Sequence, residues 1–393
     1  MIDRLALYAV TAPGLEPLTA RELERLGISP SATEPGGVTF AGSLAEVARA
    51  NLWLRTASRV LVRLGSFHAR ALGELERKAA RLSWGDWLPP TVSITVRVTC
   101  RKSRLFHQRA VAERILAASG APGAISPADE AEDSDDQSQL IVVRLFRDEC
   151  TVSLDSSGAL LHRRGYRLAT AKAPLRETLA AGLVLASGWR PSEPLVDPFC
   201  GSGTIPIEAA LLARRIPPGA RRDFGFRRWS CWDDSRWQGL VDVALGETLA
   251  RAPAPIVGAD RDAGAVTAAR TNAERAGVAG DIEFRNASLS ALDAPPGPGA
   301  LVSNPPYGVR VGERGRLRDL YARLGQVAQA RLPGWRLTLL VPAAPLERAT
   351  GLDFTPCLRT RSGGLSVRVV RSAVPSRGPE PDSQGHREPQ GLH

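Results

Sequence analysis

The chain has few cysteines and none of the cysteine spacings that bind zinc. Its five cysteines are Cys100, Cys150, Cys200, Cys231 and Cys357, and no two of them form a CxxC pair. This distribution argues against a structural zinc site and against a disulfide scaffold. We therefore expect reduced thiols, no bound metal and a cytoplasmic location.

Long apolar segments are missing as well. A membrane-spanning helix needs about 20 consecutive apolar residues, and the sequence has no such run. The first ten residues, MIDRLALYAV, lack the long apolar core and the small-residue cleavage site of a secretory leader. Hydrophobic residues make up 43% of the chain and charged residues 23%, as in an ordinary globular protein. We therefore expect no membrane partner.

Positive charge is what the chain has in excess. Its 51 lysines and arginines outnumber 41 aspartates and glutamates, which gives a formal net charge of +10. Such an excess favours a polyanionic partner, above all a nucleic acid. A generally basic surface encoded by a GC-rich genome explains the charge equally simply. The motifs must decide between these two explanations.

The pattern of predicted strands and helices changes twice along the chain. Residues 1–66 form a small α+β unit, in which Ser43 is a candidate helix N-cap. Residues 67–168 form a second α+β unit, for which we expect a mobile loop at 121–139 and two later strands joined by a turn at 156–158.

The last two parts of the chain differ sharply from each other. In residues 169–374 strands alternate with helices, which predicts a doubly wound sheet with its site at the carboxyl ends of the strands. A hairpin around Gly363 and Gly364 closes this part. Residues 375–393 are polar and rich in proline and glycine, so we expect a disordered tail.

The first motif is the stretch DPFCGSG, which begins at Asp197 after a buried strand and leads into a helix. Glycines at such a turn let a ligand approach the backbone closely. Pro206 stands where the dinucleotide fingerprint needs its third glycine, and no Gly-Lys-Ser/Thr phosphate loop is present. Hydride transfer and nucleotide hydrolysis are therefore disfavoured. A tight turn without a ligand also fits these residues, and we expect Cys200 to be a packing residue.

The second motif is Asp260, at the end of the strand PIVGAD. An acid in this position typically accepts hydrogen bonds from the two hydroxyls of a ribose. Residues 213–252, rich in arginine and tryptophan, lengthen the usual spacing from the glycine turn. Asp260 fits the cap of the next helix too, but Asp262 is available for that role.

The third motif, Asn-Pro-Pro-Tyr, follows the strand ALVS. An exocyclic amine of a base is a poor nucleophile until both N–H groups donate to acceptors and its lone pair turns out of the ring plane. The side-chain carbonyl of Asn304 and the backbone carbonyl of Pro305 are suitable acceptors. Prolines make the turn rigid, and Tyr307 offers a face on which a flipped base can stack. The motif therefore predicts methylation of a base amine, with positioning as the main source of rate.

These motifs together resemble class I methyltransferases that use S-adenosylmethionine. With NLWLRTASRV, LHRRGYR, APLRETLAA and the arginine- and tryptophan-rich insertion, nearly the whole chain is similar to bacterial THUMP-domain RNA guanine-N2 methyltransferases of the 23S rRNA type. The resemblance implies an N-terminal ferredoxin-like domain (1–66), a THUMP RNA-binding domain (67–168) and a Rossmann-like methyltransferase domain (169–374). It also implies formation of N2-methylguanosine by a monomer.

The resemblance also assigns roles to individual residues. Asn304, Pro305, Pro306 and Tyr307 are expected to hold the target base. The family often has an acid near the adenine, where this chain has Asn286-Ala287-Ser288, and either Asn286 or Ser288 fits that contact. The residues expected to bind S-adenosylmethionine are Asp197, Phe199, Cys200, Gly201, Gly203, Thr204, Asp260, Arg261, Asn286, Ala287 and Asn304.

Basic residues of the second unit are candidates for phosphate contacts. They are Arg101, Lys102, Arg104, Arg163, Arg164 and Arg167. Within the insertion, arginine alternates with phenylalanine and tryptophan, which fits either stacking on an unpaired base or a flap packed over the catalytic domain. A guanosine in tRNA is an alternative substrate, and a non-catalytic RNA-binding assembly factor is an alternative function.

Overall fold

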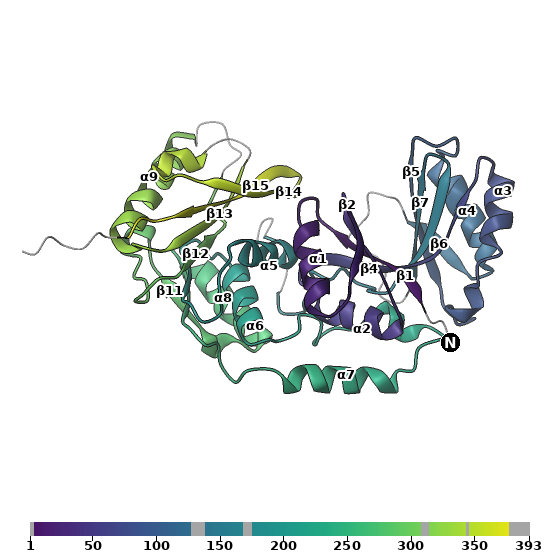
Figure 1. Ribbon diagram of the computed structural model, residues 1–393, viewed down its shortest axis with the longest axis horizontal. Helices are drawn as coiled ribbons and strands as arrows, with labels where there is room; N and C mark the ends of the chain where they lie inside the picture. Colours follow the sequence, from purple (N-terminus) through teal and green to yellow (C-terminus); the bar gives the residue numbers. More distant parts are fainter. Residues whose placement is uncertain (1–3, 127–137, 168–174, 308–313, 343–345, 377–393) are drawn as a thin grey trace, which may run out of the picture.

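The computed structural model describes residues 4–126, 138–167, 175–307, 314–342 and 346–376. Figure 1 shows two lobes, each built on one β-sheet, with the N-terminal lobe in purple to blue and the C-terminal lobe mainly in green to yellow. The tail that was expected to be disordered lies outside the described residues from 377 onward. No helix of the described segments is long and apolar enough to cross a membrane.

One continuous sheet of eight strands forms the N-terminal lobe. Strand β4 pairs antiparallel with β8, from Leu61 opposite Asp155 to His68 opposite Glu149, so the sheet runs without a break across the predicted domain boundary at 66/67. In the order of the sheet, the strands are β2 (Pro30–Glu34), β3 (Gly37–Gly42), β1 (Leu5–Thr11), β4 (Ala57–His68), β8 (Glu149–Asp155), β7 (Gln139–Phe146), β5 (Ile94–Arg101) and β6 (Gly123–Ser126).

Two expectations for this lobe are wrong. The segment expected to be a loop at 121–139 contains strand β6, and 127–137 lie outside the described residues. The turn between β7 and β8 lies at Arg147 and Asp148, not at 156–158, and both residues have positive φ, 53° and 65°. A two-residue turn of this kind normally contains glycine or asparagine, so the sequence carries no clear signal for it.

The helices of the N-terminal lobe are α1 (Glu16–Arg25), α2 (Leu44–Trp53), α3 (Leu72–Ala79) and α4 (Gln108–Ser119). The predicted N-cap of α2 is confirmed. The Ser43 side chain accepts from the backbone of the first turn, and Glu46 accepts from the Ser43 N–H at 2.8 Å, which completes a capping box. The buried side chains of these helices pack with those of the sheet and form the core of this lobe.

The C-terminal lobe has a seven-stranded sheet with helices on both faces. Helices α5, α6 and α8 share one core cluster and α9 belongs to another, as expected for a doubly wound sheet. The strands in sheet order are β11 (Ile282–Asn286), β10 (Ile256–Asp260), β9 (Leu195–Asp197), β12 (Ala300–Ser303), β13 (Arg336–Pro342), β15 (Leu365–Ala373) and β14 (Thr355–Ser362). The helices are α5 (Glu177–Ala186), α6 (Thr204–Ala213), α8 (Ala263–Ala276) and α9 (Arg314–Arg331).

The first five of these strands are parallel and the last hairpin, around Gly363 and Gly364, is antiparallel. Strand β9 lies in the middle, between β10 and β12, and the chain order reverses there. Ligands of open α/β sheets bind at such a switch point, outside the carboxyl ends of the strands. The three motifs follow β9, β10 and β12, so the topology brings them together.

The insertion at 213–252 packs on the N-terminal lobe. Trp229 and Trp237 are buried in the core of that lobe, with 3% and 6% exposure, and Phe226 lies against both rings. Helix α7 (Ser235–Gly246) contacts α2 and runs along the lower edge of the molecule in Figure 1. Packing of the tryptophans is thus confirmed, but they pack under the N-terminal sheet instead of over the catalytic domain.

Candidate functional site

The glycine turn between β9 and α6 is shaped by two glycines with different surroundings. Gly203 has φ of 82°, and a Cβ there would lie 2.9 Å from the Ala269 Cβ and 3.2 Å from the Phe284 ring, so only glycine fits. Gly201 has φ of 52°, and a Cβ added to it would meet nothing within 4 Å. The turn is therefore packed on the protein side at Gly203 and open at Gly201.

Asp260 lies beside the open part of the turn. Its Oδ2 accepts from the Gly201 N–H at 3.0 Å, and its Oδ1 accepts from the Asp262 N–H at 3.0 Å. Asp262 caps α8 by accepting from the Gly264 N–H at 2.8 Å, as the sequence predicts for it. Asp260 is thereby relieved of the capping role, and its half-buried carboxylate is fixed at the end of β10.

Asp197 is a buried carboxylate at the end of β9, with 1% exposure. Its Oδ1 accepts from the Ser303 hydroxyl at 2.5 Å and from the Phe199 N–H at 3.1 Å. Its Oδ2 is buried and has no partner among the described residues. Burial, with a smaller effect of Asp260, raises the pKa of Asp197 to about 7. A group with this environment is suited to a cationic ligand.

Asn304 follows directly after Ser303, so the contact between Ser303 and Asp197 holds the Asn-Pro-Pro-Tyr motif beside the glycine turn. The Asn304 Oδ1 is buried and finds no hydrogen-bond donor in the described part of the chain. Pro305 is buried, and Tyr307 is half-buried against the same core cluster as Cys200. The predicted acceptor is therefore available at the predicted place.

The end of β11 completes this edge of the sheet. Asp260 and Asn286 are register partners, and the Asp260 carbonyl accepts from both the Asn286 amide, at 3.0 Å, and the Ala287 N–H, at 3.0 Å. The Asn286 amide nitrogen is thus engaged in a hydrogen bond. Ser288, two positions after Asn286, and Arg261, directly after Asp260, are both exposed. Burial raises the pKa of the Cys200 thiol, which suits a packing role. Thr204 is the first residue of α6.

The residues predicted to contact phosphate differ in exposure: some are exposed, and others are buried or half-buried in ion pairs. Arg101, Lys102 and Arg104 are exposed at and after the end of β5. Arg164 must be corrected, because it is 4% exposed and its guanidinium donates to Glu208 at 3.2 Å, which makes it a structural residue. Arg167 is half-buried and pairs with Glu177 at 2.7 Å. Arg163 is exposed.

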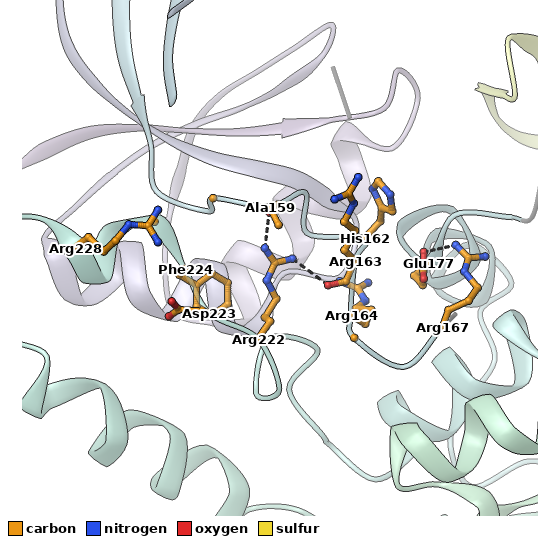
Figure 2. Close-up of a pocket in the computed structure, with 13 residues that line it drawn as sticks. Ala159, His162, Arg163, Arg164, Arg167, Glu177, Arg222, Asp223, Phe224 and Arg228 are labelled. Carbon is orange, nitrogen blue, oxygen red and sulfur yellow. Dashed lines mark hydrogen bonds and ion pairs between the residues drawn. The ribbon is translucent and has the colours of Figure 1, made fainter. Parts of the chain in front are cut away.

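A cavity of about 500 Å³ lies away from the glycine turn, and we name it the arginine cavity. Its walls come from residues 158–167, from Glu177 and from residues 222–228 of the insertion. Figure 2 shows its side chains, with Arg222 at the centre, Arg228 on one side and His162 and Arg163 on the other. The signal for this cavity in the sequence is weak and consists of the arginines spaced among aromatic residues of the insertion.

No group of three or more His, Cys, Asp or Glu side chains within the described ranges is arranged to hold a metal ion. The geometry at the ends of β9, β10 and β12 therefore offers carboxylates, one amide and an open backbone turn as its ligand-binding groups. This set fits a small ligand that carries a cation and a ribose better than it fits a metal.

Comparison with known proteins supports this interpretation of the site. Residues 164–368 match the family described as RMKL-like, methyltransferase domain, and residues 6–61 match the RlmL ferredoxin-like domain. The chain is 32% identical over 366 residues to a Synechocystis protein named "Putative RNA methyltransferase slr0064", covering 93% of this chain and 95% of that one.

Two further proteins extend the comparison. Ribosomal RNA large subunit methyltransferase K/L of Magnetococcus marinus is 38% identical over 365 residues, which are 88% of this chain but 49% of the relative. The chain thus spans about half the length of that relative. A solved structure titled "Crystal structure of SMU.472, a putative methyltransferase complexed with SAH" has a TM-score of 0.85 and 29% identity, covering 97% of this chain and 100% of that one.

The predicted ferredoxin-like and class I methyltransferase folds are both confirmed by these matches. The family match also covers the glycine turn, Asp260 and the Asn-Pro-Pro-Tyr motif. On this evidence the chain belongs to the family of RMKL-like methyltransferases, with an RlmL ferredoxin-like domain at its N-terminal end.

Proposed function

We propose that the chain is an S-adenosylmethionine-dependent RNA methyltransferase that modifies the exocyclic N2 amine of a guanosine in 23S rRNA. The observation that carries this proposal is the Asn304 Oδ1, a buried acceptor with no partner among the described residues. It lies next to a turn that is open at Gly201. An acceptor left without a donor is costly, so a ligand that supplies the donor is expected.

The cofactor fits the residues at the ends of β9, β10 and β11. The free Oδ2 of Asp197 suits the ammonium group of the methionine part, and the Asp260 carboxylate suits the ribose hydroxyls. The missing side chain at Gly201 leaves room for the ligand against the backbone. Asn286 and Ser288 remain the two candidates for the adenine contact, and the engaged amide of Asn286 leaves its oxygen for that purpose.

The mechanism requires the protein mainly to position one amine. When bound, S-adenosylmethionine supplies an electrophilic methyl group. The Asn304 Oδ1 and the Pro305 carbonyl accept the two N–H groups of the guanine amine, which directs its lone pair out of the ring plane. Tyr307 stacks on the base, and buried Pro305 keeps the turn rigid. The new nitrogen–methyl bond would form as the sulfur–methyl bond of the cofactor breaks, and the methylated amine would then lose its proton to water, so no strong base is required and positioning supplies most of the rate.

The choice of RNA rests on the relatives and on charge. Proteins named as ribosomal RNA large subunit methyltransferases share 34–38% identity with this chain. The net charge of +10 and the exposed Arg101, Lys102 and Arg104 favour a polyanion. A tRNA guanosine keeps the same chemistry with another substrate.

The deciding experiment is methyl transfer from labelled S-adenosylmethionine to unmodified 23S rRNA and, separately, to unmodified bulk tRNA. The RNA is digested and its nucleosides are separated. Label in N2-methylguanosine from 23S rRNA is the expected result. Label from tRNA alone overturns the substrate. Cofactor binding without label in either RNA supports the non-catalytic alternative.

A further inference from the structure

The arginine cavity is a built site between the two lobes. Its walls are fixed to each other by backbone contacts, since the Phe226 N–H donates to the Ser156 carbonyl at 3.0 Å, and a Cβ on Gly158 would lie 3.2 Å from the Gly225 nitrogen. Arg222 donates to the Leu160 carbonyl at 2.7 Å and to the Ala159 carbonyl. The insertion therefore forms one wall of a rigid cavity.

Positive charge dominates the lining. Five of its side chains are arginines, against the two carboxylates Glu177 and Asp223. Both carboxylates already pair with arginine: Glu177 with Arg167 at 2.7 Å, and Asp223 with Arg227, outside the cavity, at 2.7 Å. Burial, reinforced by Arg176 and Arg163, lowers the pKa of His162 to about 3, so its imidazole is neutral. Arg164 is neutralised by Glu208, which lies outside the lining. The other lining side chains still include more arginines than carboxylates.

Among the described residues that line the cavity, Arg228 is the arginine with two buried nitrogens that lack an acceptor. Its Nε and Nη2 are buried, and neither has a hydrogen-bond acceptor among the described residues. Figure 2 shows its side chain at one end of the cavity, with Arg222 between it and the pair His162 and Arg163. Burying donors of a charged group without an acceptor is costly, and a guanidinium matches the oxygens of a phosphate in geometry and charge.

We propose that the arginine cavity binds a backbone phosphate of the RNA substrate, as a second RNA-binding site besides the one for the target base. Its volume of about 500 Å³ admits one nucleotide unit. Arg164, on the cavity wall, bonds to Glu208 of α6, the helix that follows the glycine turn. A phosphate held here fixes the RNA relative to the methyl-transfer site. The inference rests on the proposed RNA substrate.

The test compares Arg228→Gln with Arg228→Lys and with Arg236→Gln in the full chain. Arg236 lies in the same insertion but its side chain is 76% exposed. RNA affinity is measured by filter binding to a 23S rRNA fragment at several salt concentrations. We expect Arg228→Gln to weaken binding roughly three- to tenfold and to lower the salt slope by about one. Arg236→Gln should change the affinity less than about twofold, and Arg228→Lys, which keeps the charge but loses the planar fork, should fall between the two.

Thermal unfolding of the same variants separates RNA binding from a structural role. Arg228 is partly buried, and two of its nitrogens have no acceptor among the described residues. Its removal should therefore leave the melting temperature of Arg228→Gln unchanged or raise it. A lower melting temperature with unchanged RNA affinity overturns the proposal. Tight binding of inorganic phosphate or guanosine monophosphate in a titration, with RNA affinity insensitive to Arg228→Gln, also overturns it and makes the cavity a small-molecule site.

The same preparations distinguish failure of this inference from failure of the proposed function. Cofactor binding and methyl transfer by the wild type are measured in parallel. RNA binding that depends on Arg228 without any methyl transfer sinks the proposed function and leaves the cavity assignment standing. If neither methyl transfer nor RNA affinity changes in Arg228→Gln, the cavity assignment fails and the proposed function stands.

Discussion

Asp197 is a buried carboxylate whose hydrogen-bond partners, Ser303 and Phe199, are both neutral. Its pKa, raised to about 7 by burial and by Asp260, makes the folded protein hold a proton that the unfolded chain releases near pH 4. Without a ligand, this group therefore makes the free energy of unfolding fall as the pH rises from about 4 to 7. A cationic ligand reverses the preference, because it stabilises the ionised carboxylate.

From this we predict that the affinity for S-adenosylmethionine rises between pH 6 and 7.5, with a limiting slope of about tenfold per pH unit below pH 7. Calorimetry in buffers of different ionisation enthalpy measures both the affinity and the proton released on binding. Asp197→Asn is the matched variant, and it should bind weakly with a flat profile. An unchanged slope in that variant contradicts the role of Asp197.

We assign Asn304 mainly to the chemistry of the base, although the family resemblance also places it among the residues expected to bind the cofactor. We predict that Asn304→Ala lowers methyl transfer by at least about a hundredfold, because one of the two acceptors for the amine is lost. Cofactor affinity should stay close to that of the wild type. Single-turnover transfer and calorimetry measure the two quantities on one sample. Lost cofactor affinity would count against the assignment.

At the scale of elements, helix α6 joins the two lobes through a buried ionic cluster. Glu208 accepts from Arg164 at 3.2 Å and from the Tyr166 hydroxyl at 3.0 Å. Arg164 also donates to the Arg55 carbonyl at 2.7 Å, and Arg55 donates to the Ile216 carbonyl at 2.6 Å. The helix that begins at the glycine turn is therefore fixed to the end of α2.

We predict that Arg164→Ala lowers the free energy of unfolding by about 3–5 kcal/mol, because the buried Glu208 loses its cation. Arg109→Ala is the control, since Arg109 pairs with Glu113 on the surface, with 86% of its side chain exposed. Arg109→Ala should lower the free energy of unfolding by less than about 1 kcal/mol. Urea denaturation measures both. Equal effects of the two substitutions would show that the cluster does not stabilise the joint.

The sequence was sufficient to predict helix caps and the alternation of strands and helices, because these depend on residues close together in the chain. Ser43 and Asp262 cap the helices for which they were expected, and the doubly wound sheet follows from alternating strands and helices. Strands β2 and β6 and helix α7 were missed. Strand β6 is four residues long and helix α7 depends on packing against another lobe. The motifs predicted the edge of the sheet where the site lies, whereas burial of Arg164 and the arginine cavity depend on distant segments.

For the whole molecule, the insertion makes the lobes interdependent. Phe224, Phe226, Trp229 and Trp237 lie between the glycine turn and Asp260 in the sequence, yet they complete the core of the N-terminal lobe. We predict that a chain without residues 1–165 aggregates, because these aromatic side chains lose their partners and become exposed. Gel filtration of the truncated and full chains, produced identically, is the measurement. A soluble, cooperatively folding truncated monomer would contradict the prediction.

The continuous eight-stranded sheet has a consequence for synthesis on the ribosome. Strand β4 meets β8 about ninety positions later in the chain, and the aromatic residues that seal the lobe follow some seventy positions after that. A nascent chain that has just completed β9 therefore has neither a sealed first lobe nor a second one. Pairings of such long sequence separation form slowly. We expect the growing polypeptide to need chaperone protection until about residue 245 has left the exit tunnel, when the first lobe can close. The second lobe closes only after β15, which ends at Ala373, has been made.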